Sequence, residues 1–210
     1  MSYEQVMEVT APLIAGAEGA AALAARMRLD ALGEAGDPEV RVALDQVVSA
    51  LADPSIFVDL DETQRQSIFG TVTSFLKQAL ELVENPGRAG GWVYTDPVVL
   101  QMQGQSSGGV PPLIARVAPM LDGLDAALAR NGARILDIGA GVAALSISCC
   151  RVWPAASVVG VDPWEPAMKL AAANIAAAGF EDRIMMRAIR IEDLTDTNEF
   201  DLAWMPAPFL

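Results

Sequence analysis

The sequence predicts an α/β protein in which an all-helical N-terminal region precedes a parallel sheet of about four strands. Two observations carry this prediction. Apolar residues recur at helical spacing through residues 1–86, whereas short apolar runs alternate with helical patterns from residue 131 onward. Strands that alternate with helices form parallel sheets with right-handed crossovers. We therefore expect a helical domain at 1–86, a connecting segment at 87–130 and a sheet domain at 131–210.

The N-terminal region carries three amphipathic helical patterns, at residues 3–32, 37–51 and 61–85. Asp61 is the predicted N-cap of the third helix, and Gln64 stands at the spacing of a capping box. The apolar stripe of this helix indicates a core or dimer contact. Since the surrounding chain is too short to bury every apolar face, we expect the region to contribute to a homodimer.

The connecting segment is rich in Gly, Ser and Gln and contains Trp92 and Tyr94. It is either a plain linker or a loop-and-helix element that covers a ligand site. Pro97, preceded by Asp96, predicts a helix start, and a further helix is expected over 113–132. We predict that residues 92–109 form a cover, since aromatic and glutamine side chains supply stacking surfaces and hydrogen bonds.

The last 80 or so residues change period, and this region supplies the predicted sheet. Short apolar runs indicate four strands, and the patterns between the first three indicate helices at 142–153 and 166–180, the second stopped by Gly179. The outer edge of the fourth strand would be unpaired, so we expect a dimer contact, a swap or the N-terminal helices to cover it. The predicted strands lie within 134–139, 157–162, 183–191 and 200–205.

Composition excludes several classes of function. The chain of 210 residues has a net charge of −13 and no histidine, so we expect neither a nucleic-acid partner nor a histidine-based metal site or general base. No apolar run reaches the length of a membrane span, and the N-terminus lacks a secretion signal. The adjacent Cys149 and Cys150 indicate buried, reduced thiols and a cytoplasmic protein.

A glycine turn follows the first strand and points to a ligand. Asp137 stands two residues before the first glycine, Gly139-Ala140-Gly141 form the turn, and Asp162 ends the second strand. Asp162 stands where a carboxylate can accept both hydroxyls of a ribose. A pyrophosphate would be repelled by Asp137, and Ala143 occupies the third glycine position of a dinucleotide fingerprint, so an NAD-type oxidoreductase is the weaker alternative. A ligand with a ribose, a positive charge and no phosphate fits better, and S-adenosyl-L-methionine has these features.

The stretches "ILDIGAGVA", "VVGVD", "RIED" and "FDLAWMPAPF" together resemble the class I S-adenosylmethionine-dependent methyltransferases, which have a Rossmann-like fold. Residues 1–86 resemble the helical N-terminal domains of many bacterial small-molecule methyltransferases. The resemblance implies that the first-strand acid and turn hold the methionine part, Asp162 the ribose, and the turn after the third strand the adenine, with Asp193 as a rival there. The cofactor-binding residues implied are Asp137, Gly139, Ala140, Gly141, Asp162, Pro163, Trp164, Ile191 and Glu192.

The resemblance implies methyl transfer to a small-molecule acceptor at oxygen, nitrogen or carbon, with S-adenosyl-L-homocysteine as product. "MPAPF" is similar to a signature of amino-nitrogen methyltransferases but lacks its first polar residue, which disfavours nucleic-acid or protein methylation. No catalytic residue and no metal ligand can be assigned. Since a class I sheet has seven strands, a fragment, or a truncated module that binds the cofactor or dimerises without catalysis, is the alternative. The candidate substrate or cover residues are Trp92, Tyr94, Gln103, Met205 and Pro206.

Overall fold

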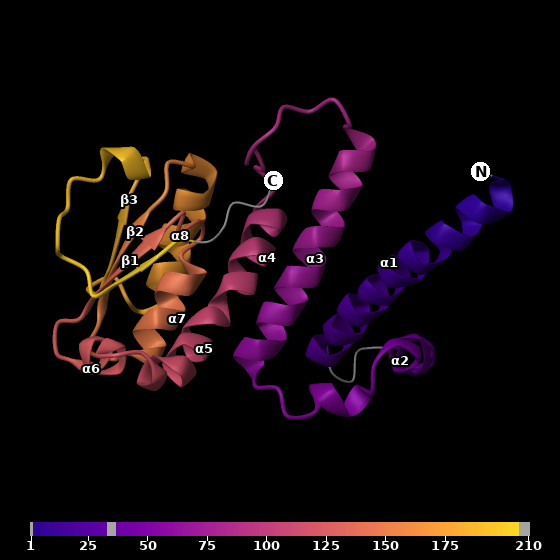
Figure 1. The fold of residues 1–210 in the computed structure, drawn as a ribbon, viewed down its shortest axis with the longest axis horizontal. Coiled ribbons are helices and arrows are strands. Elements are labelled where there is room, and N and C mark those ends of the chain that lie inside the picture. The colour runs from indigo at the N-terminus through magenta and orange to yellow at the C-terminus, as the bar shows by residue number, and fades with distance from the viewer. Residues whose placement is uncertain (1, 33–36, 206–210) are drawn as a thin grey trace. The chain divides into compact units, whose positions relative to one another are not determined.

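The chain divides into two compact units, Met1–Pro86 and Gly87–Leu210 (Figure 1). The structure, a computed structural model, describes residues 2–32 and 37–205. The first unit is helical and the second contains a parallel sheet flanked by helices. The predicted α/β fold class, with its helical N-terminal region and four parallel strands, is confirmed.

In the first unit, α1 (Tyr3–Leu32) packs against α2 (Pro38–Leu51) and α3 (Glu62–Glu84). The approach of α1 to α2 is close at Gly19, where an added Cβ would lie 1.9 Å from a methyl group of Leu51. Asp61 caps α3, and its reciprocal bonds with Gln64 form the predicted capping box. A short 3-10 turn, η2 (Pro54–Phe57), joins α2 to α3.

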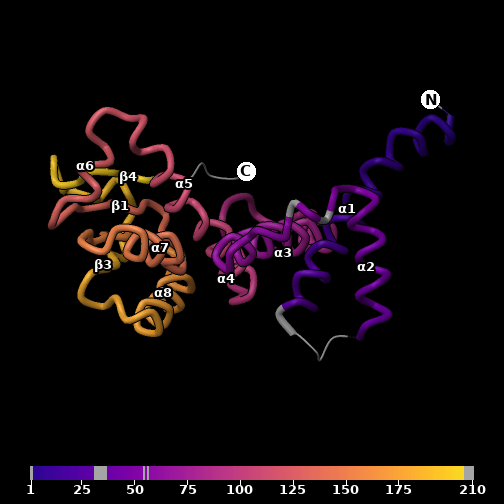
Figure 2. Tube along the Cα trace, turned by 90° about the horizontal axis from the view of Figure 1, so that it is seen from below, coloured from indigo at the N-terminus to yellow at the C-terminus, as the bar shows by residue number. Residues whose placement is uncertain are grey.

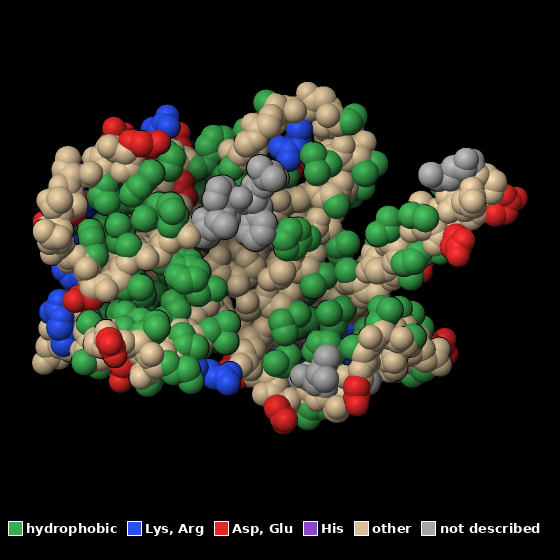
Figure 3. All heavy atoms as spheres, viewed as in Figure 1, with side chains coloured by type: hydrophobic (Ala, Val, Ile, Leu, Met, Phe, Trp, Pro, Cys, Tyr) green, Lys and Arg blue, Asp and Glu red, His purple; other side chains and the backbone are tan. Residues whose placement is uncertain are grey.

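Many apolar side chains of the first unit remain exposed. Figure 3 shows them on the surfaces of α1 and α2, and Leu13 and Val42 are 70% and 57% exposed. Within the described residues, α1 is long and apolar enough over Tyr3–Asp30 to cross a membrane. Core helices of soluble proteins and signal sequences meet the same criterion, so this finding is weak evidence for a span.

Helices precede the sheet in the second unit: α4 (Pro97–Gly108), α5 (Val110–Val117) and α6 (Leu124–Ala129). Pro97 occupies the first turn of α4, as predicted, and of the two candidate caps, Thr95 and Asp96, the cap is Asp96. The continuous helix expected over 113–132 was wrong. The chain passes through a 3-10 turn, η3 (Ala118–Met120), and then Gly123 adopts φ +77°, a left-handed conformation that ends one helix and precedes the next.

The sheet has the strand order β3-β2-β1-β4, and its strands pair in parallel. Asp137 in β1 lies opposite Gly160 in β2 and Trp204 in β4. The fourth strand covers three residues only, and its outer edge pairs with no strand within residues 37–205. The strands are β1 (Arg134–Ile138), β2 (Ser157–Val161), β3 (Ile184–Arg187) and β4 (Leu202–Trp204).

The two faces of the sheet are covered differently. One face packs Ile135 and Val158 against α7 (Ala144–Val152) and α8 (Glu165–Ala178), which lie side by side in Figures 1 and 2. On the other face, Leu136, Val159 and Val161 pack against side chains of the irregular segment that joins β3 to β4. That segment contains a single 3-10 turn, η4 (Ile191–Asp193). The core of this unit therefore lies mainly on the helical face.

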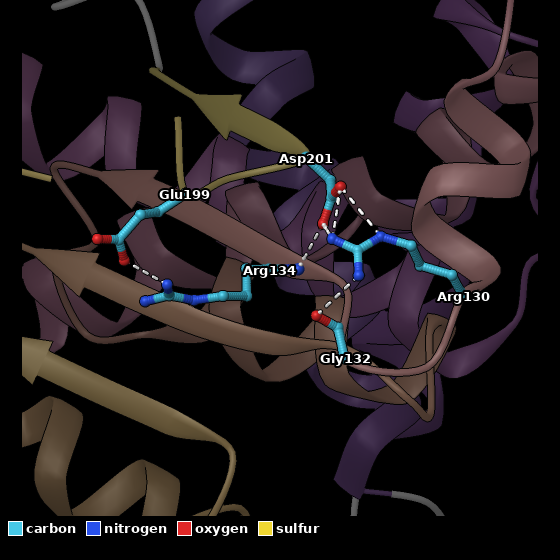
Figure 4. A network of polar contacts seen from close by, with 5 residues as sticks. All are labelled: Arg130, Gly132, Arg134, Glu199 and Asp201. Atoms are coloured by element: carbon cyan, nitrogen blue, oxygen red, sulfur yellow. Dashed lines mark hydrogen bonds and ion pairs between the residues drawn. The ribbon is translucent and has the colours of Figure 1, made fainter. Parts of the chain in front are cut away.

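A polar network fastens β4 to β1 at the amino ends of these strands (Figure 4). The Asp201 carboxylate accepts hydrogen bonds from the guanidinium of Arg130, at 2.7 and 2.9 Å, and from the backbone N–H of Arg134 at 2.8 Å. Arg134 also forms an ion pair with Glu199. The backbone bond from Arg134, followed by the bonds from Arg130, lowers the pKa of Asp201.

Candidate functional site

The candidate site lies at the carboxyl ends of β1 and β2, where the chain turns from β1 into α7. The backbone N–H groups of Gly139 and Ala140 both donate to the carbonyl of Val161, at 2.8 and 3.2 Å. These bonds hold the turn over the end of β2. In open α/β sheets, ligands bind beyond the carboxyl ends of the strands, so this edge of the sheet is the expected place for one.

Three left-handed residues shape the turn. Gly139, Gly141 and Ala143 have φ angles of +72°, +54° and +64°. Glycine adopts this conformation without strain, whereas for alanine it costs about 1–2 kcal/mol. The strained alanine is tolerated because its methyl group is fully buried in the core beside α7. Ala143 thus fills the third glycine position, and packing offsets the backbone cost.

Asp162 connects the ends of the two strands. One carboxylate oxygen accepts the N–H of Gly141 and the other accepts the N–H of Trp164, both at 2.8 Å. The side chain is 9% exposed. Each carboxylate oxygen has two lone pairs, so these amide bonds position the carboxylate and leave acceptor capacity on both oxygens. Pro163, which lies between Asp162 and Trp164 in the sequence, is exposed.

Asp137 lies beneath the turn and is 2% exposed. The hydroxyl of Ser146 in α7 donates to it at 2.7 Å. Burial, followed by the nearby negative charge of Asp162 and opposed by the Ser146 bond, raises the pKa of Asp137 to about 6. The site therefore contains two close carboxylates, and a positively charged ligand group would reduce their repulsion.

Gly160, inside β2, gives the turn room to pack. A Cβ added at this position would lie 2.9 Å from the Cβ of Ala140 and 2.5 Å from the sulfur of Met186. Ala140 is 8% exposed and rests directly on this strand. A glycine within a strand marks such a close approach, and the glycine of "SVVGVD" could have been recognised by this signal.

The segment before the sheet contacts the turn at several points. The indole N–H of Trp164 donates to the backbone carbonyl of Tyr94 at 2.7 Å. The Asn174 side chain donates to the carbonyl of Val142 at 2.9 Å and exchanges two hydrogen bonds of 3.1 Å with Gln101 of α4. An added Cβ at Gly104 would lie 2.1 Å from Val142. The helix α4 is therefore docked on the turn after β1.

The predicted residues separate into those that the structure joins and those that lie apart. Hydrogen bonds link Gly139, Ala140 and Gly141 to the end of β2, Asp162 to Trp164, and Trp164 to Tyr94. Ring contacts add Trp92, whose centroid is 4.9 Å from that of Tyr94. These groups form one continuous structure around the turn.

The remaining predicted residues lie outside the turn after β1. Ile191 and Glu192 lie in η4, exposed, and an ion pair with Arg190 lowers the pKa of Glu192. Gln103 lies inside α4, where its backbone carbonyl accepts a hydrogen bond from the hydroxyl of Ser106. Met205 is 67% exposed, and Pro206 lies outside the described residues.

Sequence reasoning missed several residues that shape the site. Ser146, Gly160 and Asn174 fix Asp137, the turn and α4, and Asn174 reaches α4 through Gln101, one of the glutamines of the predicted cover. Across residues 2–32 and 37–205, acidic, Cys and His side chains form no group of three or more that could hold a metal ion. Burial raises the pKa of both Cys149 and Cys150, so neither thiol is activated.

Comparison with known proteins agrees with this geometry. Residues 135–209 match the family model described as "Methyltransferase domain". No curated protein sequence is similar enough to count as a match. The family match therefore lies within the sheet-bearing unit and covers about a third of the chain.

Solved structures with a similar fold include a putative O-methyltransferase from Nostoc punctiforme PCC 73102, at 17% identity over 94% of this chain and 67% of that one, with a TM-score of 0.51. The mitomycin 7-O-methyltransferase MmcR has 15% identity, coverages of 87% and 65%, and a TM-score of 0.50. A putative S-adenosyl-L-methionine-dependent methyltransferase from Methanococcus maripaludis has 23% identity, coverages of 56% and 52%, and a TM-score of 0.39.

The similarity to the Nostoc punctiforme protein and to MmcR shows that the chain has the Rossmann-like fold of these methyltransferases, preceded by a helical region. At these identities the likeness concerns the fold alone. This chain spans 52% of the M. maripaludis protein and 65–67% of the other two.

Proposed function

We propose that this protein binds S-adenosyl-L-methionine and transfers a methyl group to a small-molecule acceptor. The observation that carries the proposal is Asp162, a carboxylate held by the N–H groups of Gly141 and Trp164 at the end of β2 with acceptor capacity left on both oxygens. The methyltransferase domain over residues 135–209 supports the same proposal.

The donor set of the site fits this cofactor. Asp162 would accept the ribose hydroxyls, and the exposed Gly139 and the partly buried Gly141 would adjoin the methionine part. Two carboxylates around a glycine turn suit a ligand whose ammonium and sulfonium are positive and which lacks a phosphate. Pro163 and Trp164 follow Asp162, and Ile191 and Glu192 follow β3, so these residues remain our proposed neighbours of the adenine.

S-adenosyl-L-methionine would supply a methyl group on a positively charged sulfur, which is a good leaving group. The residues of this chain would therefore bind, orient the acceptor and exclude water. Trp164 contributes to that exclusion because it fixes Tyr94 beside the turn. A general base is required only for an acceptor that must lose a proton, and we assign none.

Calorimetry with S-adenosyl-L-homocysteine tests the proposal. Changing Asp162 to Ala should weaken binding by about 1.5–3 kcal/mol, the usual loss for hydrogen bonds to a charged group. Asp182→Ala, at an exposed position of the same unit, is the matched control and should leave the affinity unchanged. Equal affinities for wild type and Asp162→Ala would show that the ribose is held elsewhere. A methyl-transfer assay then distinguishes an enzyme from the non-catalytic binding module.

We also propose that residues 92–109 cover the cofactor or acceptor. The contacts of Tyr94 with Trp164, and of α4 with Val142 and Asn174, support a cover rather than a linker. Hydrogen exchange of this segment should slow when S-adenosyl-L-homocysteine is added. Unchanged exchange in both states would leave the segment as simple packing.

A homodimer formed through the N-terminal helices is our proposal for the assembly. The exposed apolar side chains of α1 and α2 support it (Figure 3), since such surfaces are usually covered by a partner. Light scattering at high concentration should give twice the mass of one chain, and a monomer would rule the dimer out. The buried free thiols Cys149 and Cys150 support a cytoplasmic location, and the net charge of −13 supports an acceptor other than nucleic acid.

A further inference from the structure

Arg88, in the irregular segment before α4, has unpaired hydrogen-bond donors. Its Nη2 donates to the hydroxyl of Tyr94 at 3.0 Å. Its Nε and Nη1 are shielded from solvent and have no hydrogen-bond partner. An unpaired buried donor is costly, and more so when it is charged. A guanidinium with free donors on both of its edges is therefore suited to receive an anion.

One aromatic ring stands beside this guanidinium, and a second ring contacts the first. The Cζ atom of Arg88 lies 5.1 Å from the centroid of the Tyr94 ring, in a cation–π arrangement. The Trp92 ring meets that of Tyr94 edge to face at 62°. Tyr94 is 5% exposed whereas Trp92 is 41% exposed, so the cluster combines a cation with an accessible apolar ring.

The cluster is connected to the proposed cofactor site through one residue. Trp164 donates its indole N–H to the carbonyl of Tyr94, and its backbone N–H to Asp162. One side of Trp164 thus faces the cluster while its backbone orients the carboxylate proposed to hold the ribose. A ligand bound at the cluster would lie next to the site where the methyl donor is proposed to bind.

The backbone around Arg88 can admit such a ligand. Gly87, Gly90 and Gly91 flank it, and an added Cβ at any of them would meet nothing within 4 Å. Gly91 has φ +96°, which only glycine adopts readily. Ligand binding would require a small shift of this glycine-rich stretch, because the two unpaired donors are shielded from solvent.

We propose that Arg88, Trp92 and Tyr94 form the acceptor-binding subsite, and that the acceptor is a planar aromatic molecule that bears a carboxylate. The guanidinium would pair with the carboxylate through its unpaired Nε and Nη1 donors once the glycine-rich stretch has shifted to expose them. Trp92 and Tyr94 would contact the aromatic ring. The role as acceptor subsite rests on the proposed methyl transfer, whereas the binding of an aromatic carboxylate does not.

Benzoate and benzamide form a matched pair of probes, because they share ring and shape and differ in charge. Titration of the full chain, followed by tryptophan fluorescence, should show benzoate binding at least about tenfold more tightly than benzamide, as expected for charge-assisted bonds. Arg88→Met should abolish this preference, and Arg88→Lys should restore part of it because it keeps the charge but loses the planar fork. Arg116→Met removes the same charge at an exposed position of α5 and should change nothing.

The outcomes separate the two proposals. Equal binding of both probes by the wild type, or a benzoate preference that survives in Arg88→Met, would overturn the subsite. The Lys variant and the melting temperature of each protein show whether a loss reflects unfolding. Failure of S-adenosyl-L-homocysteine to bind, with benzoate selectivity intact, would refute the proposed methyl transfer and support the aromatic-carboxylate site alone.

Discussion

The pKa values of the aspartates at the two ends of the sheet are shifted in opposite directions. At the amino end, Asp201 accepts bonds from the Arg134 backbone and the Arg130 guanidinium, which lower its pKa (Figure 4). At the carboxyl end, Asp137 is buried with the Ser146 hydroxyl as donor and the negative charge of Asp162 nearby, and burial raises its pKa to about 6.

This difference shows where the unit is stabilised and where it carries strain. The amino end fastens β4 to β1 by satisfied charges, while the carboxyl end combines a buried carboxylate with a left-handed alanine. Strained and desolvated groups cluster at functional sites. The carboxyl end of the sheet, where we propose the ligand site, therefore contributes less to the stability of the unit than the amino end does.

The largest expected effect concerns Asp137. A carboxyl group whose pKa is raised in the folded state contributes stability at low pH and loses that contribution as pH rises through about 6. Relative to Asp137→Asn, the wild type should lose about 2–3 kcal/mol of unfolding free energy between pH 4 and pH 7.5. Denaturation followed by tryptophan fluorescence measures this unit alone, because all 4 tryptophans lie after residue 86.

Ser146→Ala provides the control for this measurement, since the Ser146 bond lowers the pKa of Asp137. Its removal should shift the pH-dependent loss to higher pH. A difference between wild type and Asp137→Asn that stays constant over this range would mean that Asp137 is not buried as a carboxylate.

The second prediction concerns the amino end of the sheet. Asp201→Ala should cost about 2 kcal/mol at pH 7, mainly through the unpaired Arg134 backbone N–H, since the Arg130 partner is half exposed. Because the pKa of Asp201 is lowered, the advantage of the wild type should fade as pH falls through that pKa. Glu199→Ala, which removes an ion pair with Arg134 whose carboxylate is more exposed than that of Asp201, should cost less than about 0.5 kcal/mol. Equal costs for both variants would contradict the assigned roles.

Gly160→Ala should have a smaller effect on stability, about 1–2 kcal/mol, because the new methyl group would crowd Ala140 and Met186. Affinity for S-adenosyl-L-homocysteine should also fall, since Ala140 belongs to the turn. Adding Met186→Ala removes only one of the two clashes. Full rescue of affinity by this second change would show that the turn itself had not moved.

The smallest effect is expected for Ala143→Gly. Relief of the left-handed alanine gains about 1–2 kcal/mol, whereas the lost methyl burial and the greater freedom of unfolded glycine cost about as much. The net change in unfolding free energy should stay within about 0.5 kcal/mol. Ala144→Gly, one residue on in α7, has no strain to relieve and should cost about 1 kcal/mol. Equal losses at both positions would contradict the left-handed conformation of Ala143.

Local sequence signals sufficed for most of the fold. The capping box at Asp61, the start of α4 at Pro97 and the glycine end of α8 each depend on a few neighbouring residues, and all were confirmed. The break between α5 and α6 was missed because the apolar pattern continues through Pro119 and Gly123, where the backbone departs from the helix.

The sequence predicted those site residues that lie at the ends of neighbouring parallel strands. Asp137, the glycine turn and Asp162 lie at strand ends, and parallel pairing brings strand ends together. Ser146, Asn174 and the partner of Gln101 could not be predicted, because these contacts join different elements and only the packing of helices determines them. The same is true of the unpaired donors of Arg88.

The contact between Gly104 and Val142 has a consequence for evolution. An added Cβ at 104 would lie 2.1 Å from a methyl group of Val142, so the side chains at these two positions share one small volume. Among homologues that keep α4 docked on the turn, a larger residue at 104 should occur together with a smaller one at 142. These two positions, which lie far apart in the sequence, should therefore covary as a pair.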